Sequence, residues 1–237
     1  GVILNVTGVV IPRNVMVVFT FWMNLGMASM YTFEYTHRYG IDYIAYLQQA
    51  SAVFKGETDY TKLSSNLGPC FYPAGHLYHY IAAFWLHYQT ENAEYIIKFG
   101  HLVIHSLVIY FVVKISYAYF AEEKYKKIKV GKKEKLEKYY DESRSSRAQM
   151  IAFILLAAKE DREYWATMYN DEIMMLYMLI AIYVTIKNQP LWGTFWFSMA
   201  LGIKAGVILL IPGLLGQIQY NHGTFKLLTA FVIIIGF

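Results

Sequence analysis

The sequence contains few of the residues and patterns on which soluble enzymes usually depend. Among its 237 residues there is one cysteine, Cys70, so no disulfide bond can form within the chain. Charged residues make up only 16% of the sequence, whereas soluble domains usually contain about 25%. The patterns GxGxxG, GxxxxGK[ST], HExxH, CxxC and GxSxG are all absent. The sequence therefore gives no support for the soluble enzyme classes that these patterns mark.

Hydrophobic residues, in contrast, make up 57% of the chain, and the mean hydropathy is +0.31. These values predict an all-α integral membrane protein in which 1–237 form a single transmembrane domain. A membrane-crossing helix needs about 20 mostly apolar residues. The candidate spans are 15–35, 96–120, 148–158, which is short, 173–186, 191–215 and the unfinished 227–237.

Most of the excess positive charge lies in residues 121–147, whose net charge of +4 equals that of the whole chain. We expect this segment to be a solvated, charged loop on the cytoplasmic side. Nucleic-acid binding is disfavoured because acidic residues are interleaved with the lysines and no aromatic platform accompanies them.

Positive charge near the ends of spans marks the cytoplasmic side of a membrane protein. Arg13 and the lysine-rich segment then predict that the long first loop, 36–75, faces the opposite, lumenal side. In that arrangement, 76–88 would form a partial helix that enters the membrane from the lumenal side and returns. Residues 166–172 would also be lumenal.

Asp42 follows the first candidate span by a few residues and begins an amphipathic stretch. Ile44, Ala45 and Leu47 are expected to share one face of that helix. Aspartate is a favoured residue at helix N-termini, so Asp42 is either a capping residue or a general base.

Three further segments contain residues with a possible structural or functional role. Asn170 and Asp171 are typical of a helix N-terminus, where acids are favoured. Lys204 lies within an apolar run, and a lysine there is a functional candidate that could pair with an acid or a ligand phosphate. The alternative is that its side chain extends to the membrane surface. In the loop 68–76, Pro73 is typical of helix entry and Gly75 permits a close backbone approach.

The histidines give a weak metal-site signal. His101 and His105 have the i, i+4 spacing of metal ligands, and His76, His79 and His87 lie on one predicted partial helix. No acid or thiol lies at a spacing that would complete a site, so packing or interfacial roles are favoured and no metal is expected.

The motifs "IDY", "AYLQQ", "DYTKL", "GPCFYPAGH", "YNDE", "ALGIK" and "IPGLL" occur in this order between residues 41 and 215. In this respect the sequence resembles the dolichyl-phosphate-mannose-dependent α-1,3-mannosyltransferases of the endoplasmic reticulum, multi-pass membrane enzymes of the GT-C class. The resemblance implies a GT-C-like helical bundle with a lumenal active site. It also implies transfer of mannose to the five-mannose lipid-linked oligosaccharide used in N-glycosylation.

The resemblance further implies roles for particular residues. Asp42 would be the general base that deprotonates the acceptor hydroxyl, and the reaction would proceed with inversion. Tyr72, His76, Asn170, Asp171 and Lys204 would bind the substrates, with Lys204 and His76 near the leaving phosphate. No cofactor beyond the donor lipid is expected. The expected partners are the two lipid-linked substrates and membrane lipids.

The chain also departs from the family pattern, which carries an arginine before Asn170 and an asparagine after Lys204. Members of the family are considerably longer than 237 residues. Two hypotheses therefore remain, an active mannosyltransferase and a shortened, catalytically inactive subunit of a larger membrane complex. A transferase that uses another lipid-linked sugar is a third.

Overall fold

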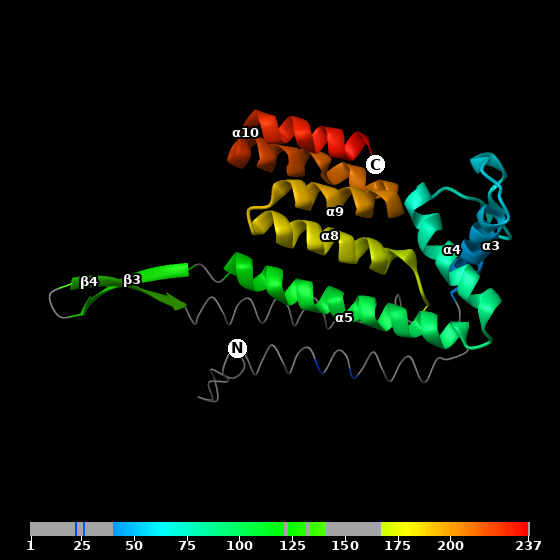
Figure 1. The fold of residues 1–237 in the computed structure, drawn as a ribbon, viewed down its shortest axis with the longest axis horizontal. Helices are drawn as coiled ribbons and strands as arrows, with labels where there is room; N and C mark the ends of the chain where they lie inside the picture. The colour runs from blue at the N-terminus through cyan, green and yellow to red at the C-terminus, as the bar shows by residue number, and fades with distance from the viewer. Residues whose placement is uncertain are drawn as a thin grey trace.

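The computed structural model describes residues 22, 26, 40–120, 123–130, 133–140 and 167–236. Arg13, most of the predicted span 15–35 and the whole of 148–158 lie outside these residues. Within the described part, most residues are helical, as the sequence predicts, and the helices form a stack with a smaller unit at one end (Figure 1).

The stack consists of four helices that lie side by side; the first two in chain order run in the same direction, and the third runs opposite to them (Figure 1). They are α5 (Ala93–Phe120), α8 (Asn170–Ile186), α9 (Pro190–Ile203) and α10 (Ile211–Ile235). Helices α8 and α9 approach closely at Gly193, where a Cβ atom would lie 2.0 Å from Thr185 Oγ1 and 3.1 Å from the Ala181 carbonyl oxygen. The glycine therefore allows the two helices to pack together.

Helix α5 supports the predicted span at 96–120. Its segment Ala93–Ser116 has a mean hydropathy of 2.0 over its most apolar part and is long and apolar enough to cross a membrane. By these criteria of length and composition, it is the one such helix within the described ranges. The predicted span 173–186 corresponds to α8, which is helical but contains 17 residues.

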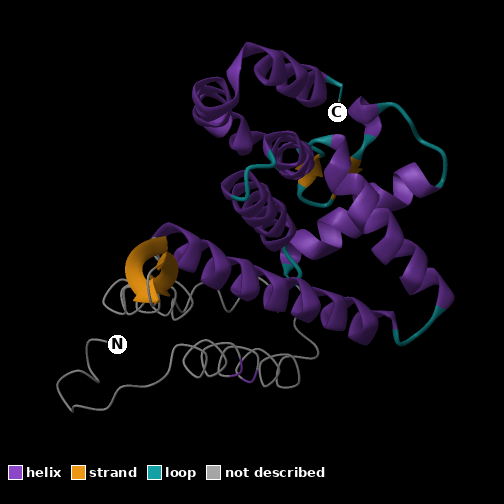
Figure 2. Cartoon of the chain, turned by 60° about the vertical axis from the view of Figure 1, so that its left-hand side comes forward, coloured by secondary structure: helices purple, strands orange, loops and turns teal. Residues whose placement is uncertain are grey.

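The predicted single helix at 191–215 is wrong. Helix α9 ends at Ile203, Lys204 is extended with φ −142° and ψ 118°, and a 3₁₀ helix covers Ala205–Leu210 before α10 begins. The predicted start of a further helix at 227 is supported, because α10 consists of two helical segments and the second, which ends at Ile235, follows a break at Gly223. At Gly223 the backbone has φ 79°, a value that favours glycine, and the chain reverses there (Figures 1 and 2).

The strictly all-α prediction also needs correction. Where a charged loop was expected, β3 (Glu123–Val130) and β4 (Lys133–Tyr140) form an antiparallel hairpin after α5. The register pairs Glu123 with Tyr140 at one end of the hairpin and Val130 with Lys133 at the other. The segment also contains Tyr, Ile and Val, which have high strand propensities.

The end unit contains α3 (Ile41–Phe54) and α4 (Ala74–Gln89), which cross beside the beginning of α5 and α8 (Figure 2). Between them lie a 3₁₀ turn (Tyr60–Lys62) and two short paired strands, β1 (Ser64–Ser65) and β2 (Gly68–Pro69). The predicted long loop 36–75 is therefore ordered and partly helical from residue 40 onward.

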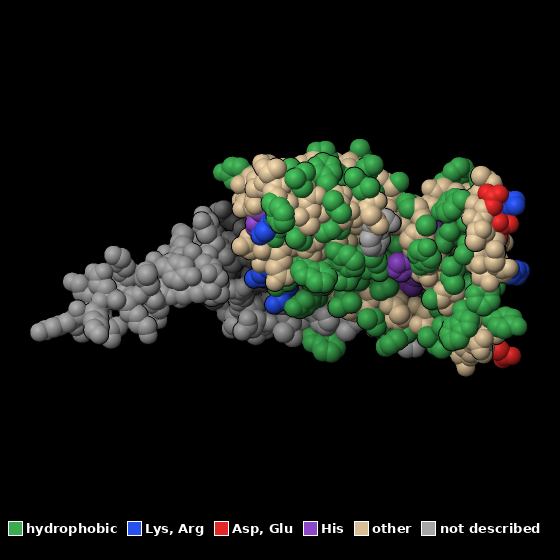
Figure 3. Space-filling model, turned by 45° about the horizontal axis from the view of Figure 1, so that its top comes forward, with side chains coloured by type: hydrophobic (Ala, Val, Ile, Leu, Met, Phe, Trp, Pro, Cys, Tyr) green, Lys and Arg blue, Asp and Glu red, His purple; other side chains and the backbone are tan. Residues whose placement is uncertain are grey.

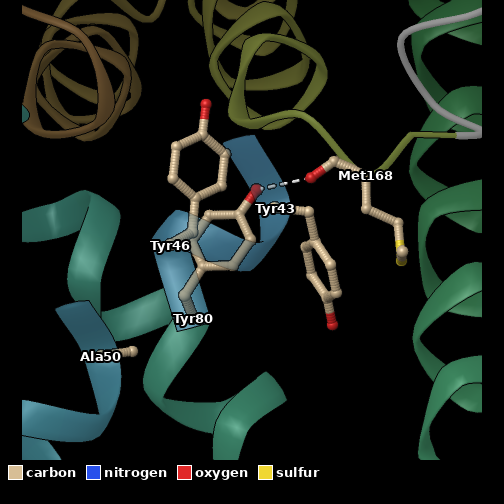
Figure 4. Close-up of a cluster of buried hydrophobic side chains, with 5 residues drawn as sticks. All are labelled: Tyr43, Tyr46, Ala50, Tyr80 and Met168. Atoms are coloured by element: carbon tan, nitrogen blue, oxygen red, sulfur yellow. Dashed lines mark hydrogen bonds between the residues drawn. The ribbon is translucent and has the colours of Figure 1, made fainter. Parts of the chain in front are cut away.

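A tyrosine cluster forms the core of this unit (Figure 4). Tyr43, Tyr46 and Ala50 of α3 pack against Tyr80 of α4 and against Met168, which precedes α8. The Tyr80 hydroxyl donates to the Met168 carbonyl oxygen at 2.9 Å. Ala45 does not share the face of Ile44, since Ala45 is buried while Ile44 is 42% exposed.

Candidate active site at the end of the helical stack

The loop before α4 is held in place by Tyr60. Its hydroxyl donates to the carbonyl oxygen of Tyr72, and the Cys70 backbone N–H donates to the Leu63 carbonyl at 2.8 Å. Asp59 caps the 3₁₀ turn that carries Tyr60, accepting from the Thr61 N–H at 3.1 Å. The motifs "DYTKL" and "GPCFYPAGH" are therefore two halves of one folded loop.

Gly75 then brings α4 directly against α9. A Cβ atom at Gly75 would lie 2.7 Å from the carbonyl oxygen of Gly202 and 2.9 Å from its carbonyl carbon. The predicted close backbone approach is confirmed, and it fixes the loop beside the end of α9 where Lys204 lies.

His76 is fully buried within a cage of aromatic rings. The rings of Tyr46, Tyr72 and Tyr80 have centroids 4.5, 4.5 and 4.8 Å from its imidazole. The Asn170 amide Nδ2 donates to His76 Nδ1 at 3.1 Å, which leaves the proton of the neutral ring on Nε2. Nε2 is buried and has no hydrogen-bond partner among the described residues, and Asn170 is also fully buried.

Burial lowers the pKa of His76 to about 3, with a smaller contribution from His79. Its imidazole is therefore neutral at physiological pH and does not supply a positive charge. Tyr72 is half-buried, since one side of its ring packs against His76 while its hydroxyl lies 3.3 Å from that of Tyr46.

Asp42 lies in the first turn of α3 and is half-buried. It is not the capping residue, because the N-cap position is Gly40, whose backbone is extended. Gly40 is packed tightly, since a Cβ atom there would lie 3.0 Å from the Thr167 carbonyl oxygen. This contact joins the start of α3 to the turn that precedes α8.

Asp42 and Asp171 both act electrostatically on Tyr80. Burial raises the pKa of the Tyr80 phenol well above its usual value, and Tyr43, Asp171, Tyr72 and Asp42 raise this pKa further. The negative charge of each carboxylate opposes ionisation of the Tyr80 hydroxyl.

Lys204 forms an ion pair with Asp171, which is one of the alternatives that the sequence left open for this lysine. Asp171 lies in the first turn of α8, and Lys204 directly follows the last residue of α9. Both side chains are a little more than one-third exposed, at 38% and 36%. The pair is thus reachable from outside the protein and close to the loop that Gly75 anchors.

A second ion pair was missed by sequence reasoning. Glu172 of α8 places Oε1 2.5 Å from His105 Nδ1 of α5, and both side chains are buried. Spacing along the sequence does not show this pair, because the two residues are 67 positions apart. In the described residues, no group of three or more His, Cys, Asp or Glu side chains is arranged to hold a metal ion.

The candidate site therefore joins residues from four elements. Figure 3 shows histidine surface between the helical stack and the end unit, at their junction. The partly accessible residues are Asp42, Tyr72, Asp171 and Lys204, whereas His76 and Asn170 lie beneath them. Such an arrangement offers carboxylates for proton removal and one lysine to neutralise a phosphate.

Comparison with known proteins identifies relatives. The family model described as ALG3 protein matches residues 14–237. A Dictyostelium discoideum protein named "Probable Dol-P-Man:Man(5)GlcNAc(2)-PP-Dol alpha-1,3-mannosyltransferase" is 30% identical over 203 residues, which cover 81% of this chain and 44% of the relative. The human Dol-P-Man:Man(5)GlcNAc(2)-PP-Dol alpha-1,3-mannosyltransferase is 25% identical over 81% of this chain and 39% of its own length.

A Kluyveromyces lactis relative with the same name as the human protein is 27% identical over 79% of this chain and 37% of its own length. The chain thus spans less than half the length of these curated relatives. No solved structure matches it. Since the family model covers nearly every residue, the chain belongs to the ALG3 protein family.

Proposed function

We propose that this chain carries the catalytic residues of a mannosyltransferase of the endoplasmic reticulum membrane. The donor is dolichyl-phosphate-mannose, and the acceptor is the five-mannose lipid-linked oligosaccharide Man(5)GlcNAc(2)-PP-Dol that the relatives' names specify. The product is an α-1,3-linked mannose. The observation that carries the proposal is the packing of Gly40, two residues before Asp42, against Thr167, which precedes the first turn of α8 where Asp171 pairs with Lys204.

Asp42 serves as the general base in this proposal. Its carboxylate takes the proton from the acceptor 3-hydroxyl as that oxygen attacks the anomeric carbon of the donor. The bond from that carbon to the phosphate oxygen breaks, and the configuration inverts. A single displacement of this kind needs one base, with a sugar hydroxyl in the position that water takes in inverting glycosidases.

Lys204 neutralises the dolichyl phosphate that leaves. A phosphate leaving group is already ionised, so it requires a cation or hydrogen-bond donors and no general acid. Lys204 is the cation best suited to this role because it is accessible and held by Asp171. His76 is neutral and buried, so its role is to support Tyr72 and the loop around Asn170.

The site faces the lumen in this proposal. Glu57, Asp59 and Glu91 belong to the end unit by sequence, and Lys187 lies in the turn after α8 at the other end of the stack. Figure 3 shows the acidic surface of this face on the end unit, with some basic surface beside it, and only basic surface at the far end of the stack. This distribution agrees with the rule that positive charge remains on the cytoplasmic side.

The test supplies the purified protein with dolichyl-phosphate-mannose and the acceptor lipid and follows transfer of labelled mannose. Asp42→Asn should lower the rate by about a hundredfold or more, because the base is lost while the shape remains. Glu91→Gln, which makes the same chemical change at an exposed position at the same end, should leave the rate unchanged.

Two results would contradict the proposal. Equal transfer by wild type and Asp42→Asn would remove Asp42 from the mechanism. A wild-type protein that binds membranes but transfers no mannose would favour the hypothesis of a catalytically inactive subunit.

A further inference from the structure

The first turn of α8 is tied to α5 by the Glu172–His105 pair, which the proposed reaction does not use directly. The imidazole Nδ1–H donates to the carboxylate Oε1 at 2.5 Å. Both side chains are less than one-tenth exposed. A buried carboxylate is stable only when it is paired, so this contact restricts how the start of α8 can move against α5.

The same turn carries the site residues Asn170 and Asp171. Successive residues in an α-helix point in directions about 100° apart. Glu172 accordingly meets α5, while Asp171 meets Lys204 after the end of α9. A rotation or shift of this turn that breaks the contact of Glu172 would therefore also move Asp171.

We propose that Glu172 and His105 are positioning residues. Through the first turn of α8, they keep Asp171 where it holds Lys204 toward the donor phosphate. This inference rests on the proposed function for its catalytic consequence, but the effect on Lys204 can be measured without any transfer reaction.

A comparable contact in the same helix provides a matched control. His79 Nδ1–H donates to the Gly75 carbonyl oxygen at 2.8 Å, so His79 Nε2 accepts from the Tyr177 hydroxyl at 2.7 Å. This bond ties α8 to α4, but it lies between one and two turns beyond Asp171. Tyr177→Phe removes the bond without touching the first turn of the helix.

The first measurement is the reactivity of the Lys204 amine in the full chain, purified in detergent. A water-soluble acylating reagent is applied briefly, and modification of Lys204 is quantified by mass spectrometry. Glu172→Leu should raise the rate by about twofold or more, the lower end of coupling between residues in one network. Glu172→Gln should stay near wild type because its amide oxygen still accepts from His105, and Tyr177→Phe should not change the rate.

The second measurement is steady-state transfer, corrected for the folded fraction. Glu172→Leu should lower kcat by about tenfold to a hundredfold with the donor KM nearly unchanged, since misplacement of a group acts mainly in the transition state. Glu172→Gln should restore most of the rate. If Glu172→Leu does not fold, His105→Leu replaces it, with His105→Asn as the variant that keeps a donor near the position of Nδ1.

The two measurements separate the inference from the proposed function. Unchanged Lys204 reactivity and unchanged kcat in the leucine variants would overturn the positioning role. Wild-type protein without transfer activity would overturn the proposed function, and Lys204 reactivity would still decide whether the pair positions Asp171.

Discussion

His76 is the residue whose environment most clearly predicts a response to pH. Burial lowers its pKa to about 3 from an ordinary value of 6.5, so below pH 6.5 the unfolded chain binds a proton that the folded protein does not. The free energy of unfolding should therefore decrease as the pH falls, by up to about 1.4 kcal/mol per pH unit from this group. Thermal unfolding in detergent between pH 7.5 and pH 5 measures this decrease.

His76→Asn is the informative variant for this prediction. The asparagine Oδ1 can accept from the Asn170 amide as Nδ1 does now, but the side chain does not titrate. The variant should therefore lose less stability on acidification than wild type does. The same loss of stability in both proteins would mean that His76 is protonated in the folded state or that other groups dominate.

At the level of secondary structure, the contact between α4 and α9 depends on Gly75. In Gly75→Ala the new methyl group would lie 2.7 Å from backbone atoms of Gly202, which cannot rotate away as a side chain could. The helices must separate, and we expect a loss of about 1–3 kcal/mol in stability, with reduced transfer. The change in thermal midpoint and the transfer rate measure these effects.

Gly100→Ala in α5 is the matched control, because within the part of the chain that the structure describes no atom outside its own helix lies within 4 Å of the new Cβ. That substitution should be neutral or slightly stabilising, since alanine favours the helix over glycine. A Gly75→Ala protein as stable as Gly100→Ala would show that α4 and α9 do not approach as closely as described.

The helices that could be predicted from sequence are those with long apolar stretches. The core of α5 and most of α8 follow from hydropathy, and Asp171 follows from the preference for acids at helix starts. The break after Ile203 did not follow from hydropathy, because a continuous apolar run predicts a single helix. Lys204 leaves the helix at the residue that pairs with Asp171 of another element, and such a contact is not visible within one segment.

The candidate site was predictable in the same limited sense. The motifs around Asp42, Tyr72 and Lys204 identify a family, and the lysine in an apolar run predicts a partner acid. Two contacts could not be predicted because neither has a local sequence signal: the Glu172–His105 pair and the hydrogen bond from the Tyr60 hydroxyl to the Tyr72 carbonyl oxygen. Such contacts depend on how separate elements pack against one another, and the periodicity of hydrophobic residues within one element carries no information about that packing.

Across the molecule as a whole, the separation of charge predicts the orientation in the membrane. The end unit with Glu57, Asp59 and Glu91 should be lumenal, and the turn after α8, which carries Lys187, should be cytoplasmic. The test uses a Cys70→Ser background, which leaves the described residues without a cysteine, and adds one at exposed Leu67 or exposed Gln189. In sealed microsomes, a membrane-impermeant maleimide should label Gln189→Cys directly but Leu67→Cys only after permeabilisation.

The Cys70→Ser protein should remain unlabelled in both cases. Labelling of Leu67→Cys in sealed vesicles would place the candidate site on the cytoplasmic side, where the lumenal reaction proposed above could not occur.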